Sequence, residues 1–71
     1  MKREILHVIP QPDKTWGLKF HGRSRLYKQF ANKSDAVLNA LYYAWKNSVR
    51  MVCIHDYNGI VVKEVSFVNV K

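Results

Sequence analysis

The sequence predicts an α+β fold in which one helix packs on one face of an antiparallel sheet of four to five strands. Two observations predict this. Segments in which apolar and polar residues alternate lie on both sides of one stretch with helical periodicity. A hairpin turn signal, Asp-Tyr-Asn-Gly at residues 56–59, joins the last two of these segments. The expected order is strand, strand, a further strand in the five-stranded version, helix, strand, strand. A chain of 71 residues has room for one core, so residues 1–71 are expected to form one domain.

The strands before the helix are indicated by alternation and by turn residues. The first is expected over residues 4–9, an apolar stretch that ends at Pro10. The second is expected over residues 16–20, where one face is aromatic and apolar and the other is polar and basic. A third is expected over residues 25–30. It follows a turn at Gly22, because glycine readily supplies the positive φ that tight turns need.

The helix is expected over residues 33–47. Asn32 can cap it by accepting a hydrogen bond from the first free amides, and Asp35 favours the positive end of the helix dipole. At about 100° per residue, one apolar stripe runs along the helix and would pack on the sheet. The stripe consists of Ala36, Val37, Ala40, Leu41 and Ala44. Leu38, Tyr42 and Trp45 widen the apolar arc beyond what packing on one sheet requires.

Two strands are expected after the helix, over residues 50–55 and 60–68, on either side of the turn at residues 56–59. In the first of them Val52 and Ile54 alternate with a second set of side chains. Cys53 belongs to that set and is expected to be a small buried hydrophobic residue.

Several short segments together resemble a family of small bacterial and phage proteins, domain of unknown function 2188. They are His-Val-Ile-Pro at residues 7–10, Trp16, Asn-Lys-Ser-Asp-Ala at residues 32–36, and His-Asp-Tyr-Asn-Gly at residues 55–59. The resemblance implies a sheet-plus-helix fold and no particular activity. The chain departs from the family in its helix, which tends to be rich in alanine and charge in relatives but is aromatic here. A role for that surface is therefore not carried over.

The positive charge is concentrated before the helix. The net charge is +7 for the chain, of which +6 lies in residues 1–33 and +1 in residues 34–71. Such asymmetry indicates an anionic partner, and the alternative is a solvated face that keeps a small protein soluble. We expect non-catalytic nucleic-acid binding, with phosphates held by cations, weak sequence preference and Tyr27 stacked on a base. The alternative for Tyr27 is that it packs. The candidate residues are Lys14, Lys19, His21, Arg23, Arg25, Tyr27 and Lys28.

Aromatic residues on the helix give a second functional hypothesis, a protein-interaction module. It would form a homodimer, or bind an acidic protein partner through the helix surface or the basic face. The family resemblance adds the possibility of a phage-encoded inhibitor of a host protein. The alternative is that these side chains fold onto the sheet edge or the chain termini. The candidate residues are Leu38, Tyr42, Tyr43 and Trp45.

Catalysis and metal binding are not indicated. His7, His21 and His55 fall on three expected strands without a close pair, so no zinc site is expected. Neighbouring strands could bring His7 and His55 together, and a ribonuclease-like pair beside a lysine is conceivable. The favoured interpretation is half-exposed strand histidines bonded to backbone or water. The five carboxylates form no convincing pair. We expect no enzyme and no cofactor.

Composition also bears on location. No apolar run reaches the roughly 18 residues of a membrane span, and the apolar stretch before Pro10 is too short for a signal peptide. Cys53 is the one cysteine, which excludes an internal disulfide scaffold. Nine aromatic residues argue against intrinsic disorder. The sequence therefore predicts a cytoplasmic protein that does not interact with membranes.

Overall fold

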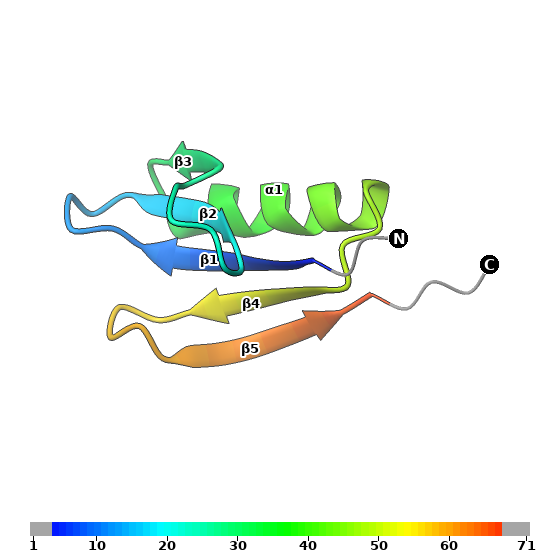
Figure 1. The fold of residues 1–71 in the computed structure, drawn as a ribbon. Helices are drawn as coiled ribbons and strands as arrows, with labels where there is room; N and C mark the ends of the chain where they lie inside the picture. The colour runs from blue at the N-terminus through cyan, green and yellow to red at the C-terminus, as the bar shows by residue number, and fades with distance from the viewer. Residues whose placement is uncertain (1–3, 68–71) are drawn as a thin grey trace.

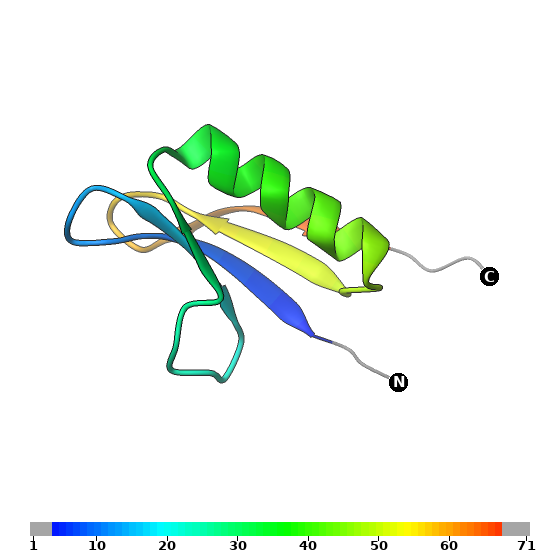
Figure 2. The same cartoon turned by 90° about the horizontal axis from the view of Figure 1, so that it is seen from above.

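The computed structural model describes residues 4–67. Within them, five strands form one sheet, and one helix covers one of its faces (Figures 1 and 2). The predicted α+β class is confirmed, including the third strand. The elements in chain order are β1 (Ile5–Pro10), β2 (Trp16–Phe20), β3 (Lys28–Phe30), α1 (Lys33–Lys46), β4 (Met51–His55) and β5 (Val61–Ser66).

The sheet is mixed, so the prediction of a wholly antiparallel sheet was wrong in one pair. The strand order is β3-β2-β1-β4-β5, and the central pair β1–β4 is parallel while the other three pairs are antiparallel. The reason is the direction of α1. The helix carries the chain back along the sheet, so β4 starts at the same end as β1 (Figure 1).

Most expected boundaries differ from the structure by one residue at most, and the start of the third strand differs by three. The third strand covers Lys28–Phe30 rather than residues 25–30, because residues 21–27 form a loop. The loop is closed by backbone bonds, one of which runs from the amide of Tyr27 to the carbonyl of Leu18 at 2.6 Å. Strand β5 runs over Val61–Ser66. Its expected end at Val68 lies outside the described residues.

Helix α1 begins and ends where local hydrogen bonds satisfy its free backbone groups. The side-chain oxygen of Asn32 accepts from the Asp35 amide at 3.0 Å, as the capping pattern predicted. At the other end the Asn47 amide donates to the Tyr43 carbonyl at 2.9 Å. None of the helices among the described residues is long and apolar enough to cross a lipid bilayer.

The core lies between α1 and the central strands. Three alanines on α1 are completely buried, and their small side chains let the helix lie close to the sheet. The opposing layer comes from alternate positions of β1, β2 and β4. It consists of Leu6, Val8, Trp16, Leu18, Val52 and Ile54. The side chains between these positions point to the other face, which α1 does not cover and which we call the open face.

Candidate functional site

The open face brings together polar side chains from four strands of the sheet. The strand registers place His7 of β1 between Lys19 of β2 and Cys53 of β4. Next to Cys53, on β5, lies Glu64. The loop of residues 21–27 projects from the sheet on this same side, away from α1 (Figure 2). Polar side chains from four separate segments of the sequence thus lie on one surface.

All three histidines of the chain lie in contact on the open face. The Nδ1 atom of His7 is 3.0 Å from Nε2 of His55, and Nε2 of His7 is 3.1 Å from Nδ1 of His21. The ring centroids are 5.2 and 5.3 Å apart. The Nδ1 atom of His55 lies 2.9 Å from the carbonyl oxygen of Gly59. We call His21, His7 and His55, in this spatial order, the histidine row.

The carbonyl of Gly59 fixes the direction of the hydrogen bonds in the neutral row. A carbonyl oxygen only accepts, so Nδ1 of His55 carries the proton and its Nε2 accepts. His7 must then donate through Nδ1 and accept through Nε2, and His21 must donate through Nδ1. These are tautomers inferred from hydrogen-bond partners. The outer nitrogen of the row, Nε2 of His21, is left as an acceptor.

Sequence reasoning foresaw part of this arrangement. It allowed His7 and His55 to meet on adjacent strands, but it favoured histidines bonded separately to backbone or water and did not place His21 with them. His21 follows β2, and its amide donates to the Ile5 carbonyl at 2.8 Å. It therefore stands diagonally across the β1–β2 pair from His7. One signal could have found it. His7, Lys19 and His21 all have odd numbers in one hairpin, and its register turns the odd-numbered residues of both strands to the same face.

The surroundings favour the neutral forms of His7 and of the neighbouring Cys53. Burial, followed by the nearby His55, His21 and Lys19, lowers the pKa of His7. Cys53 is buried, as predicted, and burial followed by the charge of Glu64 raises the pKa of its thiol. Both shifts favour the uncharged forms of His7 and Cys53.

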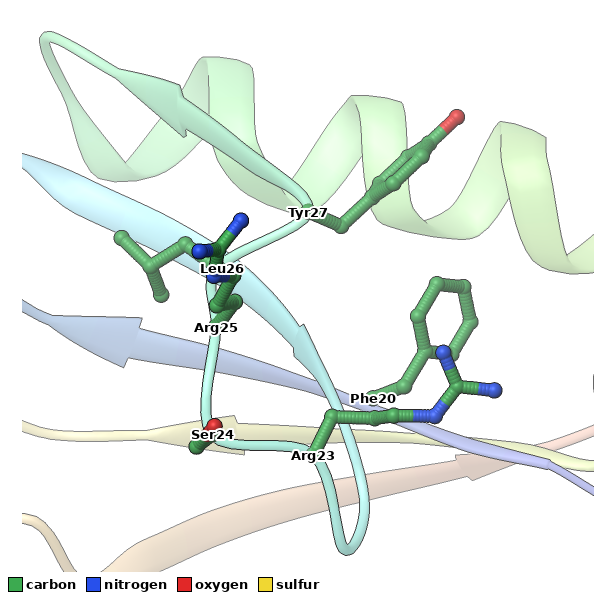
Figure 3. Close-up of a pocket in the computed structure, with 6 residues that line it drawn as sticks. All are labelled: Phe20, Arg23, Ser24, Arg25, Leu26 and Tyr27. Carbon is green, nitrogen blue, oxygen red and sulfur yellow. The ribbon is translucent and has the colours of Figure 1, made fainter.

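Two arginines of the predicted patch, Arg23 and Arg25, lie on the projecting loop. Residues 20 and 23–27 line an open hollow of about 440 Å³ there (Figure 3). Arg23 is largely exposed, and its guanidinium is 3.8 Å from the carboxylate of Glu4. Of the seven predicted binding residues, the structure thus places Lys19 and His21 on the open face, and Arg23 and Arg25 on the projecting loop.

The other three predicted residues lie elsewhere. Tyr27 points toward α1 (Figure 3), with its ring centroid 5.5 Å from Phe20 and 5.2 Å from Tyr43. Lys28 is on the helix side too, with its Nζ atom 5.9 Å from the Tyr27 ring centroid. Lys14 lies in the β1–β2 turn with a φ of 70°. Tyr27 therefore packs one side of its ring against Phe20 and Tyr43, while 44% of the residue stays exposed.

The predicted interaction surface is also divided. Leu38, Tyr42 and Trp45 are 65%, 59% and 72% exposed, one or two helical turns apart on α1. Tyr43 lies on the flank that meets the sheet and packs edge-on against Phe20 at 5.7 Å. The exposed aromatic surface is therefore Leu38, Tyr42 and Trp45.

Within residues 4–67, no group of three or more His, Cys, Asp and Glu side chains has the arrangement to hold a metal ion. The row itself shows why. His7 meets its two neighbours through different ring nitrogens, so the three imidazoles do not converge on one point.

Comparisons with known proteins identify the family alone. No curated protein and no solved structure matches this chain. The model of the family described as "uncharacterized protein conserved in bacteria (DUF2188)" matches residues 6–67, in agreement with the resemblance seen in the sequence. The chain therefore belongs to the DUF2188 family.

Proposed function

We propose that this protein is a non-catalytic, cytoplasmic module that binds single-stranded nucleic acid on the open face of its sheet. The observation that carries the proposal is that Lys19 lies beside the histidine row, and that the loop with Arg23 and Arg25 projects from the sheet on the side that α1 leaves uncovered. Cations can follow the phosphates of a strand, and imidazole rings can stack on unpaired bases. A duplex hides the faces of its bases, so this combination favours a single strand.

The local charge supports an anionic ligand. The acidic residue in register on this face, Glu64, is on β5, three strand spacings from Lys19 on β2. That is about 14 Å, which exceeds a Debye length of about 8–10 Å at physiological salt. The contact between Arg23 and Glu4 is exposed, and such pairs contribute only about 0–1 kcal/mol. Arg23 can therefore exchange Glu4 for a phosphate at little cost.

Salt dependence tests the proposal. Three phosphate contacts predict that log affinity for a single strand falls with log salt with a slope of about −2. We expect this slope from fluorescence anisotropy with a labelled single-stranded oligonucleotide. Each of the variants Lys19→Gln, Arg23→Gln and Arg25→Gln should reduce its magnitude by about 0.7.

The matched control is Lys46→Gln, which removes one positive charge from the last turn of α1. It should leave the slope unchanged. The proposal fails if the protein binds no DNA or RNA at low salt, or if the control weakens binding as much as the open-face variants do.

We propose as a second function a protein-interaction module that uses Leu38, Tyr42 and Trp45. The observation in its favour is the exposure of three large apolar side chains on one helix surface. This surface would join two copies of the chain or bind a host protein. It lies on α1, so it is independent of the open face. Light scattering on the parent protein and on Trp45→Ala measures self-association directly.

A further inference from the structure

The geometry points to the histidine row as a store for one extra proton, which makes the open face a pH-dependent phosphate site. We infer that binding of a nucleic-acid phosphate takes up this proton. The choice of ligand rests on the proposed function, whereas the one-proton property follows from the contacts of the row alone.

The first step is a count of hydrogens. The row contains six ring nitrogens. In the neutral state one hydrogen lies in each of the two contacts between rings, and a third lies between His55 and the Gly59 carbonyl. The Nε2 atom of His21 has none. This outer nitrogen is the one position that can accept a hydrogen without disturbing an existing contact.

One added proton leaves every contact intact, wherever its charge resides. If the charge is on His21, both nitrogens of that ring carry hydrogen and the bonds keep their direction. If it is on His7, that ring donates on both sides and His21 accepts through Nδ1. If it is on His55, that ring donates to His7, and His7 in turn donates to His21. In all three cases Nε2 of His21 bears a hydrogen, so the protonated row always presents an N–H donor at its outer end.

A second added proton breaks the row. Five hydrogens would then be shared among the same positions, and one contact between two rings would hold two of them. Nitrogens 3.0 or 3.1 Å apart cannot both carry a hydrogen directed at the other. The two rings would have to separate. The intact row therefore binds one proton and resists a second.

Charges on every neighbouring element affect this proton. Lys19 on β2 lies directly across from His7, and Arg23 and Arg25 lie on the loop beyond His21. All three disfavour a further positive charge. Glu64 on β5 and Asp56 in the β4–β5 turn are the described carboxylates on the far side, and Asp56 is already engaged by the amides of residues 58 and 60. The thiol of Cys53 on β4 is neutral.

A bound phosphate reverses this balance. Its negative charge beside Lys19 stabilises the protonated row, and its oxygen accepts from the outer N–H of His21. By linkage, a ligand that favours the protonated row binds more tightly as pH falls. The lowered pKa of His7 agrees with a central ring that is neutral before the ligand arrives.

The first experiment uses the ligand-free protein. Imidazole ¹⁵N NMR at pH 8 should show Nδ1–H tautomers in all three rings. Titration to pH 5 should show uptake of one proton while the contacts between rings persist. An Nε2–H tautomer in any ring at pH 8, or three independent titrations all complete by pH 5, would overturn the one-proton row.

The second experiment measures affinity for a thymidylate oligonucleotide of about ten nucleotides from pH 8 to pH 5.5, at constant salt and with EDTA present. Thymine does not titrate in this range. We expect log affinity to rise by up to one unit per pH unit for the parent protein and for the Lys46→Gln control. His21→Gln should lose this increase with falling pH, because the outer end of the row then no longer gains a proton.

The two experiments separate the inference from the proposed function. Binding that does not change with pH would overturn the phosphate coupling and leave the proposed function standing. A confirmed row in a protein that binds no oligonucleotide would overturn both the coupling and the proposed function, while the one-proton row stands.

Discussion

Leu26 lies directly over the backbone of Gly17, and its two methyl carbons are 2.8 and 2.9 Å from the position that a Cβ atom would take there. Gly17 is in β2, on the open face, and Leu26 belongs to the loop of residues 21–27. The absence of a side chain at Gly17 thus lets the loop that carries Arg23 and Arg25 lie against the sheet.

This contact predicts that the effect of Gly17→Ala depends on Leu26. In the parent protein the new methyl group displaces the Leu26 side chain, and we expect a loss of about 1 kcal/mol of unfolding free energy. In a Leu26→Ala background the space is free, and restriction of the unfolded chain should make the same change neutral or stabilising by about 0.4–1 kcal/mol. Urea denaturation of the four proteins measures this coupling. Equal effects in both backgrounds would contradict it.

The cap of α1 gives a second prediction. Asn32 accepts a hydrogen bond from the amide of Asp35 at 3.0 Å, and alanine cannot replace it. We expect Asn32→Ala to lower the unfolding free energy by about 1 kcal/mol, and Asn32→Asp to retain the parent value. Thermal unfolding followed by circular dichroism distinguishes the two variants. Equal stability of both would show that the cap contributes little.

Local features of the fold could be predicted from the sequence because each depends on neighbours in the chain. Alternation located the strands, the Asn32 cap located the start of α1, and residues 56–59 located the hairpin. The parallel pairing of β1 and β4 could not be predicted, because no local pattern says which strands become neighbours. The third strand was predicted three residues too long for a related reason. The chain at residues 25–27 crosses the sheet edge, with Leu26 on the open face and Tyr27 toward α1.

The candidate site was predictable in composition but not in geometry. The basic residues around Lys19 were identified from charge alone, whereas the sides on which Tyr27 and Lys28 lie depend on the β2–β3 register. The histidine row depends on two strand registers. His21 meets His7 through an antiparallel register, and His7 meets His55 through a parallel one. Neither register is encoded within a single segment, so the row emerges only once the sheet is assembled.

Two nearby positions of α1, Trp45 and Tyr43, are expected to respond differently to truncation. Trp45 is 72% exposed, so Trp45→Ala should change the unfolding free energy by less than about 0.5 kcal/mol. Tyr43 packs against Phe20 and Tyr27, so Tyr43→Ala should cost about 1–3 kcal/mol. If α1 joins two copies, Trp45→Ala should also reduce the mass found by light scattering at high concentration. An unchanged monomeric mass in both proteins would exclude a homodimer through this surface.

The histidine row predicts how stability depends on pH. The pKa of His7 in the folded protein is below its ordinary value of 6.5, so the unfolded chain binds that proton more tightly. The stability contributed by neutral His7 is therefore complete above about pH 6.5 and is lost as pH falls from there through the lower pKa of the folded state. Urea midpoints at pH 8, 6.5 and 5 should decrease in that order.

His7→Gln should flatten this dependence, because the titrating ring at the centre of the row is gone. Asp13 does not interfere with this measurement. Hydrogen bonds from Thr15 lower the pKa of its carboxyl below the ordinary value of 3.8, so its titration affects stability only at more acidic pH. Nucleic acid should oppose the loss of stability at pH 5, since a ligand that favours the protonated row stabilises the folded protein in that state. A parent protein equally stable at pH 8 and pH 5 would contradict the burial of a neutral His7 between its two neighbours.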